Sequence, residues 1–426
     1  MDNTLGCVMV ELPLGDAASD FNLEKAVCSD GLFMMAPNHW DSPSKTLTRP
    51  LRLSPDGAAS VVRISHRDRQ ALHLRVLGTR SLSPPQRRSL QVQVRRMLRL
   101  SEEESWRVKE FHELHQEAKG RGFGRLFRSP TLFEDMVKCI LLCNCQWPRT
   151  LSMAEALCEL QLELQSAASA GNGTTPTLQA TEYKHFAPNT PARKESKKRS
   201  RRANAVEMPE SYKGMESSPI TDNLHLQIQA AEGDQPLNTT GDNAGTRIAN
   251  FPSPEELARL DEKFLAKRCG LGYRAGRVIN LARGIIQGTI QLDVFEDACG
   301  TPSLSVYNSL FEKLRAIDGF GPFTCANVLV CMGFYHNIPT DSETIRHLKQ
   351  VHGKISDTKT VGSHVEKLYG KYAPFQHLAY WYEVWHFYEE WFGNLSEIPR
   401  PNYRLITAAN MKPEKLKSTT SKKMKL

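Results

Sequence analysis

The sequence lacks any apolar run near the roughly 18 to 20 residues that a membrane-spanning helix requires, so we expect no membrane span. Cysteine is scarce: ten in 426 residues are too few for a disulfide scaffold, which favours a reducing compartment. No Arg occurs before Arg49, and acidic residues occur in the first twenty positions, which argues against a secretory signal or transit peptide. With 40% hydrophobic and 24% charged residues, the composition is typical of a water-soluble protein.

Positive charge is concentrated in two short segments. Residues 193–202 carry +6 and residues 411–426 carry +5, so the rest of the chain is negative although the total is +8. The first segment predicts a nuclear import signal that an import receptor reads, and a solvated run of charges is the alternative. Its basic residues are Arg193, Lys194, Lys197, Lys198, Arg199, Arg201 and Arg202. We therefore expect a nuclear protein.

The apolar pattern divides the chain into a β-rich part and a mainly helical part with a long insert. Alternating stretches at 51–53, 62–64 and 72–76 predict an antiparallel sheet, and helical periodicity begins near residue 84. Residues 166–249 hold only 13 large apolar side chains among 84, too few to offset the ordering entropy, so we expect disorder there. The predicted fold class is α+β. The expected parts are a flexible N-terminus (1–20), a β-rich domain with a linking helix (21–103), the first helical part (104–165), the insert (166–249), the second helical part (250–397) and a basic tail (398–426).

Two candidate functional features lie in the second helical part. Gly319 and Gly321 connect two predicted helices, and glycines there let the backbone approach a phosphate with its N–H groups, although a plain corner is the commoner use. Asp341 precedes another predicted helix and is first of all a candidate N-cap. A carboxylate held ionised there also suits stabilising an oxocarbenium-like sugar and orienting water against its anomeric carbon. The two roles are compatible.

Three separated motifs resemble the helix-hairpin-helix DNA glycosylase superfamily of base excision repair. The first is the hairpin followed by Pro339-Thr-Asp341. The other two resemble the 8-oxoguanine glycosylase and AlkA-like branch: Phe251-Pro-Ser with Leu271-Gly-Tyr-Arg-Ala275, and Ser129-Pro-Thr-Leu-Phe-Glu leading to Cys143-Asn144. The resemblance covers roughly residues 111–160 and 251–392. It implies an enzyme that flips a damaged or mispaired base out of duplex DNA and hydrolyses its N-glycosidic bond.

The resemblance also assigns roles to residues. Asp341 would be the catalytic carboxylate, and Tyr273 would fill the gap left by the flipped nucleotide, with an ordinary helix-start aromatic as the alternative reading. The residues expected to face the opposite base are Asn144, Arg149 and Arg274. The residues expected to form the phosphate-binding hairpin, with a monovalent cation as an optional ligand, are Gly319, Phe320, Gly321, Phe323 and Thr324.

One position departs from the bifunctional members of the superfamily. Those members carry a Lys two residues after the second hairpin glycine, where its amine attacks the sugar, and this chain has Phe323 there. The sequence therefore favours monofunctional hydrolysis with water as the nucleophile. Two alternatives remain open: a DNA-binding protein that recognises lesions or bends without chemistry, and a bifunctional glycosylase/AP lyase that uses another amine.

The residues expected to contact the flipped base also depart from the oxoguanine branch. Glu343 stands where that branch has a His, and His377 and Trp381 fall at the positions that would line the base pocket. These differences argue against 8-oxoguanine as the default substrate. Trp381 also begins an apolar helix stripe with Trp385, and such a stripe more often belongs to a core.

The sequence predicts no metal site and no cofactor beyond the optional monovalent cation. Cys139, Cys143 and Cys145 lack CxxC spacing and nearby His partners, so buried small side chains are the favoured interpretation. No Cys follows Cys331, which excludes the four-Cys iron–sulfur loop that some superfamily members carry. The expected partner is duplex DNA that contains a damaged base, and we expect a monomer.

Overall fold

The computed structural model describes residues 6–54, 57–169, 249–300 and 302–411. All of these described residues belong to one compact unit. The expected import signal, nearly all of the expected insert and the residues after 411 lie outside the described part of the chain.

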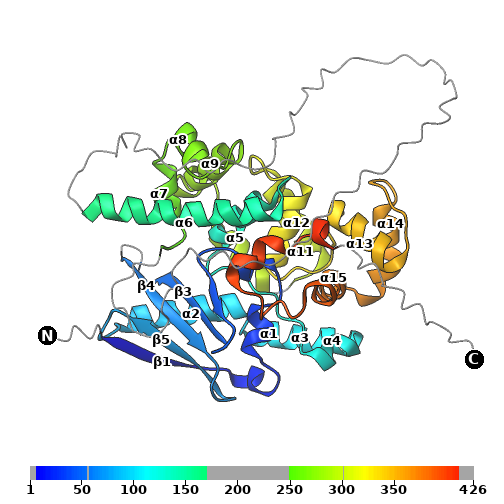
Figure 1. The fold of residues 1–426 in the computed structure, drawn as a ribbon, viewed down its shortest axis with the longest axis horizontal. Helices are drawn as coiled ribbons and strands as arrows, with labels where there is room; N and C mark the ends of the chain where they lie inside the picture. The colour runs from blue at the N-terminus through cyan, green and yellow to red at the C-terminus, as the bar shows by residue number, and fades with distance from the viewer. Residues whose placement is uncertain (1–5, 55–56, 170–248, 301, 412–426) are drawn as a thin grey trace, which may run out of the picture. The chain divides into compact units, whose positions relative to one another are not determined.

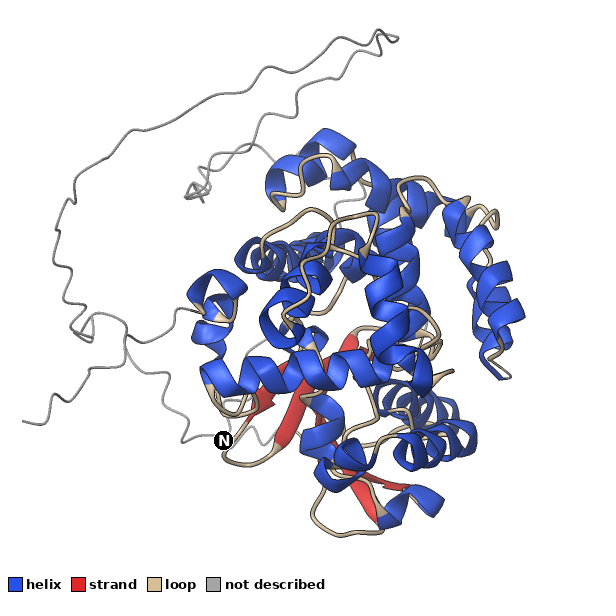
Figure 2. Ribbon diagram, turned by 90° about the vertical axis from the view of Figure 1, so that its right-hand side faces the viewer, coloured by secondary structure: helices blue, strands red, loops and turns tan. Residues whose placement is uncertain are grey.

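The N-terminal part is an antiparallel sheet with the strand order β1-β5-β4-β3-β2 (Figure 2, red). Its strands are β1 (Cys7–Pro13), β2 (His39–Asp41), β3 (Thr46–Arg52), β4 (Ala59–Ser65) and β5 (Ala71–Leu77). Alternation of large apolar residues gives the sheet one buried face, as in β5, where Leu72, Leu74 and Val76 are fully buried. That face shares a hydrophobic cluster with Leu90 and Val94 of the first long helix. The predicted N-terminal sheet is confirmed.

Helices make up most of the remaining described residues (Figure 1). The α-helices are α1 (Leu23–Val27), α2 (Pro84–Leu98), α3 (Glu102–Leu114), α4 (Gln116–Arg121), α5 (Leu132–Leu142), α6 (Trp147–Ser169), α7 (Pro254–Ala258), α8 (Glu262–Arg268), α9 (Arg274–Ile286), α10 (Leu292–Asp297), α11 (Leu304–Arg315), α12 (Pro322–Cys331), α13 (Ser342–His352), α14 (Val361–Tyr369) and α15 (Gln376–Phe392). The 3-10 helices are η1 (Gly15–Ser19), η2 (Gly31–Met34), η3 (Ala298–Gly300), η4 (Gly370–Tyr372), η5 (Arg400–Leu405) and η6 (Ala408–Asn410). None of the described helices is long and apolar enough to cross a membrane.

Local sequence signals begin several of these helices. Ser83 and Gln86 form a reciprocal capping box at α2, where proline occupies the first turn. Ser253 and Glu256 repeat the arrangement at α7. Thr131 caps α5 through the backbone N–H of Glu134. The helix starts predicted from the sequence therefore rest on hydrogen bonds that satisfy otherwise unpaired N–H groups.

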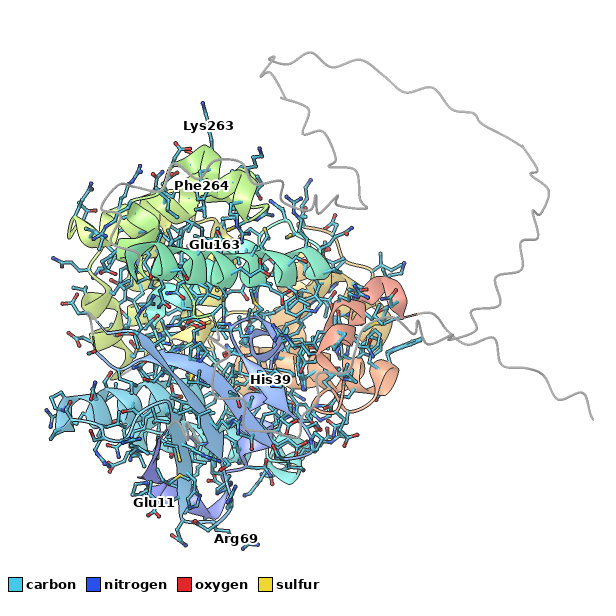
Figure 3. The ribbon with its side chains drawn as sticks, turned by 60° about the vertical axis from the view of Figure 1, so that its left-hand side comes forward. Glu11, His39, Arg69, Glu163, Lys263 and Phe264 are labelled. Atoms are coloured by element: carbon cyan, nitrogen blue, oxygen red, sulfur yellow. The ribbon has the colours of Figure 1, made fainter. Side chains whose placement is uncertain are left out.

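Three hydrophobic clusters hold the elements together. One cluster joins α5 and α6 to α8, α9, α11 and α12, and another joins the sheet to α1 and α2. The third surrounds α3, α13 and α14. Helix α15 contributes to two clusters, since Trp385 packs in the cluster of the sheet and Val384 in the third. Helices α6 and α8 are neighbours, because Arg268 pairs with Glu163 at 2.6 Å (Figure 3 labels Glu163).

Two expected boundaries are wrong. Strand β1 lies inside the segment expected to be flexible (1–20), because Val8, Val10 and Leu12 alternate inward and pair with β5. The folded part also extends beyond residue 397, since η5 places Tyr403 in the cluster of the sheet. In both cases a few apolar residues next to a polar terminal segment were enough to order the chain against a core.

Candidate functional site

Asp341 begins helix α13 as its N-cap. Its Oδ1 accepts a hydrogen bond of 2.9 Å from the backbone N–H of Thr344 and lies 3.1 Å from the Thr344 hydroxyl. That hydroxyl is 3.0 Å from the hydroxyl of Tyr380 on α15 and 2.5 Å from the Pro339 carbonyl oxygen. The N-cap interpretation is confirmed. Thr344 holds the carboxylate, and Tyr380 of α15 contacts the hydroxyl of Thr344.

Burial changes the proton affinity of this carboxyl group. Burial raises the pKa of Asp341 from the ordinary 3.8, the two hydrogen bonds from Thr344 oppose this, and the charge of Glu343 adds to the rise. A carboxylate with a raised pKa is a better proton acceptor, which suits it to orient and activate water.

The hairpin between α11 and α12 has the backbone that its glycines predict. Gly319 has a φ of +82°, which non-glycine residues rarely adopt, and a Cβ there would lie 2.8 Å from Nε of Arg277. Gly321 is the N-cap of α12 and has no side chain within 4 Å of the place where its Cβ would be. The backbone of the hairpin can thus approach a large ligand closely.

The other predicted hairpin residues have different surroundings. Phe320 is buried in the helical core, and Thr324 is buried with its hydroxyl 2.9 Å from Sγ of Cys143. Both side chains support the hairpin from within, so they could meet a phosphate only through their backbone. Phe323 is half-buried, and its carbonyl oxygen accepts a hydrogen bond from Asn327 on the next turn.

Tyr273 is an exposed aromatic side chain between two guanidinium groups. It is 44% exposed at the start of α9, and the guanidinium carbons of Arg274 and Arg277 each lie 4.6 Å from its ring centre. Arg277 also lies against Gly319 of the hairpin. The structure therefore links the predicted wedge to the predicted phosphate site through one side chain.

The residues expected to face an opposite base gather near Tyr273 but are not equally accessible. Arg274 is buried, and its guanidinium donates to the carbonyl oxygens of Cys143 and Asn144. It supports the loop after α5, in which Asn144 adopts a φ of +46° and is exposed. Arg149 is exposed and donates to the Gly270 carbonyl oxygen at 3.1 Å. Direct contact with a base is therefore open to Asn144 and Arg149, while Arg274 supports the backbone of Asn144.

The predicted base-pocket residues His377 and Trp381 form a stacked pair on α15. Their ring centres are 6.1 Å apart with an interplanar angle of 9°, and the indole N–H of Trp381 donates to the Ser29 carbonyl oxygen. Burial lowers the pKa of His377 to about 3, so its imidazole is neutral at physiological pH. Its Nδ1 has no hydrogen-bond partner among the described residues. His377 also contacts the ring of Tyr380, which connects the pair to Asp341.

Glu343 is occupied by other contacts. It forms an ion pair with Arg346 and accepts a hydrogen bond of 2.9 Å from the Tyr388 hydroxyl. A ligand would have to compete with both partners, so Glu343 is better suited to orient the start of α13 than to bind a base.

Three residues of this site were not predicted from the sequence. Thr344 holds Asp341, Tyr380 contacts the hydroxyl of Thr344, and Arg277 joins the wedge to the hairpin. Arg277 follows Tyr273 at i+4 on the same predicted helix, a spacing that could have suggested contact. The partner of Thr344 could not have been found, because Tyr380 comes from a distant helix.

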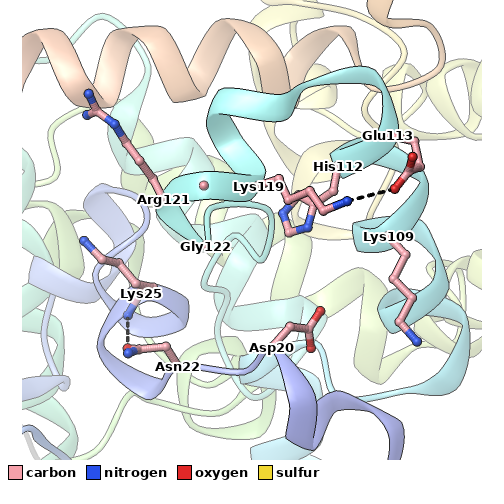
Figure 4. Close-up of a pocket in the computed structure, with 10 residues that line it drawn as sticks. Asp20, Asn22, Lys25, Lys109, His112, Glu113, Lys119, Arg121 and Gly122 are labelled. Carbon is pink, nitrogen blue, oxygen red and sulfur yellow. Dashed lines mark hydrogen bonds and ion pairs between the residues drawn. The ribbon is translucent and has the colours of Figure 1, made fainter.

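A cavity of about 470 Å³ lies apart from all these residues (Figure 4). It is lined by α3, α4 and the segment around α1, and its cations include Lys25, Lys109 and Arg121. Its Lys119 is paired with Glu113 at 3.1 Å. Its His112 is bonded to the Phe123 carbonyl oxygen. We assign this cavity no role.

Comparison with known sequences gives one limited match. No family model matches the chain. A curated N-glycosylase/DNA lyase of Saccharomyces cerevisiae is 27% identical over 133 residues, which are 30% of this chain and 34% of the relative. The chain thus spans about a third of the length of this relative.

Solved structures match over nearly the whole chain. The 3-methyladenine DNA glycosylase from Archaeoglobus fulgidus has a TM-score of 0.52 and 14% identity over 90% of this chain and 99% of its own. The protein MBOgg1, solved with a low affinity DNA ligand, has a TM-score of 0.51 and 17% identity over 92% of this chain and 97% of its own. The apo 8-oxoguanine glycosylase/lyase of Clostridium acetobutylicum has a TM-score of 0.50 and 14% identity over 89% of this chain and 96% of its own. The resemblance predicted from the sequence is confirmed at the level of fold: this chain has the fold of these DNA glycosylases.

Proposed function

We propose that this protein is a DNA glycosylase that hydrolyses the N-glycosidic bond of a flipped damaged or mispaired base in duplex DNA. The observation that carries the proposal is the half-buried carboxylate of Asp341, which Thr344 holds. The Thr344 hydroxyl in turn contacts Tyr380, whose ring packs against the stacked pair of His377 and Trp381. A protein that only binds DNA would need Asp341 only as the N-cap of α13. The shared fold and the partial sequence match support the same reading.

Each group of residues has a step in the proposed reaction. The backbone of the hairpin and Arg277 hold the backbone of the DNA, while Tyr273 enters the space that the flipped nucleotide leaves. Trp381 and neutral His377 stack on or bond to the extruded base. Asp341 then stabilises positive charge on the sugar and orients the attacking water. No covalent bond to the protein is needed.

We propose a monofunctional reaction because none of the hairpin residues that the structure describes carries a side-chain amine. Phe323 occupies the position at which the resemblance predicts a Lys. Lys138, on α5, is fully buried and pairs with Glu134 at 2.7 Å, so it cannot serve instead. This differs from the lyase activity in the name of the yeast relative.

Borohydride trapping tests the monofunctional reaction. A Schiff base between a protein amine and the sugar is reduced to a stable adduct, whereas hydrolysis by water leaves nothing to trap. We expect no covalent protein–DNA adduct with wild-type protein and a lesion duplex, measured by denaturing electrophoresis. A robust adduct that is lost on replacing one Lys would show a bifunctional enzyme instead.

Strand cleavage with and without alkali tests the proposed function itself. Duplexes with oxidised, alkylated, deaminated or mismatched bases are incubated with the protein, and half of each sample is heated in alkali. We expect cleavage after alkali only, for at least one duplex, because hydrolysis leaves an intact strand with an abasic site. Cleavage without alkali would indicate a lyase, and none in either arm would favour a protein that only binds DNA.

Arg277→Ala should weaken DNA binding by about tenfold. It should also reduce the slope of log affinity against log salt concentration by about 1, the value for one phosphate contact. The expectation follows because Arg277 touches both Tyr273 and Gly319, and no described acidic residue pairs with it. Fluorescence anisotropy across a salt series measures both quantities. Arg69→Ala is the matched control, since Arg69 is an exposed Arg in the β4–β5 turn (labelled in Figure 3). Equal affinity and salt dependence in the two variants would show that Arg277 does not contact DNA.

Localisation, oligomeric state and a hairpin cation are further parts of the proposal. We propose that the protein acts in the nucleus as a monomer, carried there by an import receptor that reads residues 193–202. A monovalent cation at the hairpin stays part of the proposal and is needed for none of its steps.

A further inference from the structure

Two histidines and a glutamate from separate helices meet next to the site. His347 and His352 lie on α13 and Glu383 on α15, and one ligand atom of each lies within 4.8 Å of the other two. Nε2 of His352 is 2.8 Å from Glu383 Oε1, and Nε2 of His347 is 3.6 Å from Glu383 Oε2. The first distance is that of a charge-assisted hydrogen bond, and the second is too long for one.

His347 is the residue that needs an explanation. Its side chain is fully buried, and neither ring nitrogen has a hydrogen-bond partner among the described residues. The ring packs edge-on against Tyr380 and Phe387. An unpaired polar group in such surroundings is costly, and an ion is one of the few things that can satisfy it.

The geometry fits a small divalent ion. With bonds of about 2.0–2.1 Å, tetrahedral ligands lie roughly 3.3–3.4 Å apart. The distances of 2.8 Å from Oε1 of Glu383 to His352 and 3.6 Å from its Oε2 to His347 lie on either side of that value. Small side-chain shifts would let the carboxylate bind the same ion as both imidazoles. Two imidazoles and a carboxylate are ligands that Zn²⁺ favours.

The surroundings of the cluster also fit a metal site. The hydroxyl of Tyr369 on α14 donates to Glu383, which fixes the carboxylate as the outer partners of metal ligands do. The side chains of His352 and Glu383 are 23% and 28% exposed, so an ion can enter from solvent and keep a water ligand.

We propose that His347, His352 and Glu383 form a zinc-binding site that fastens α13 to α15. Asp341 caps the same α13, and Tyr380 lies one turn before Glu383 on α15. The ion would therefore hold the two helices between which the Asp341–Thr344–Tyr380 contacts are made. The site does not depend on the proposed glycosylase activity, because it can be tested without DNA.

Metal binding by the whole chain tests the proposal. After removal of metal with a chelator, Zn²⁺ should raise the melting temperature, and Co²⁺ should give the visible absorption of a tetrahedral site. The near-ultraviolet charge-transfer band of thiolate ligation should be absent, which separates this site from the ten free cysteines. Elemental analysis should find one zinc per chain.

Variants of these residues, with matched controls, show whether they are the ligands. Glu383→Gln and His352→Ala should weaken metal binding at least tenfold and abolish the Co²⁺ spectrum. Glu389→Gln and His386→Ala, also on α15, should leave both unchanged. His352 is partly exposed, so its variant should fold even if Glu383→Gln does not. Absence of the Co²⁺ spectrum in wild type, or its survival in His352→Ala, would show that the cluster is an ion pair without metal.

Discussion

Glu134→Gln should lower the free energy of unfolding by about 3–5 kcal/mol, the cost of leaving buried charges without their counter-ion. Glu134 on α5 lies 2.9 Å from Arg49 of β3 and 2.7 Å from Lys138, and all three side chains are almost fully buried. Arg49 also donates to Asn38 at 2.9 Å. The carboxylate therefore joins the sheet to the helical part, and its neutral analogue would leave two cations unpaired.

Urea unfolding followed by circular dichroism measures this loss. Glu113→Gln is the control, because the Glu113–Lys119 pair is mostly exposed and such pairs contribute at most about 1 kcal/mol. Adding Lys138→Met to Glu134→Gln should restore part of the stability, since it removes one unpaired cation. A loss below about 1 kcal/mol for Glu134→Gln would contradict the role given to this cluster.

The same carboxylate predicts a pH dependence. Burial opposes its ionisation, but the charges of Arg49 and Lys138 outweigh this and lower the pKa of Glu134 to about 2. The folded pKa lies below the ordinary 4.5, so the stabilisation is complete above pH 4.5 and is lost as the pH falls toward 2. The difference in unfolding free energy between wild type and Glu134→Gln should therefore shrink over that range.

Asp341→Asn should reduce the rate of base release by about 10²- to 10⁴-fold while DNA affinity stays nearly unchanged. Asn accepts the same N-cap hydrogen bond from Thr344 and is as good a cap as Asp, so helix α13 should keep its start. The negative charge that would face the sugar is lost. The raised pKa of Asp341 also predicts that the wild-type rate falls on the acid side at a pH above 3.8.

Single-turnover rates at saturating protein separate chemistry from binding in this variant. Asp357→Asn is the matched control, because Asp357 also accepts hydrogen bonds from the backbone of the next residues but lies in an exposed turn. We expect the control to release base at the wild-type rate. An equal loss of rate in both variants would indicate that the substitutions impair folding. A wild-type rate in Asp341→Asn would show that Asp341 has no part in the reaction.

Features set by neighbouring residues were predictable from the sequence. The alternation in β5, the hairpin glycines and the N-cap at Asp341 each depend on a few consecutive residues, and each is present in the structure. Strand β1 was missed although Val8, Val10 and Leu12 alternate within it. Its partner β5 lies about sixty residues further along the chain, and that pairing could not be read from the local pattern.

Features set by packing between distant helices were not predictable. The burial that raises the pKa of Asp341 and the contact from Tyr380 require α13 and α15 to be packed together. The burial of Arg274 likewise follows from the carbonyl oxygens that the loop after α5 presents. His347 and Glu383 show the same limit, since neither resembles a metal ligand until the two helices meet.

The central claim is that this chain breaks a glycosidic bond, and direct detection of the free base tests it most directly. Wild-type protein in excess is incubated with each lesion duplex for a single turnover, and the small molecules are analysed by mass spectrometry. The account predicts a free base from at least one duplex, with the DNA strand left intact. Tight binding of these duplexes with no base released from any of them would contradict it.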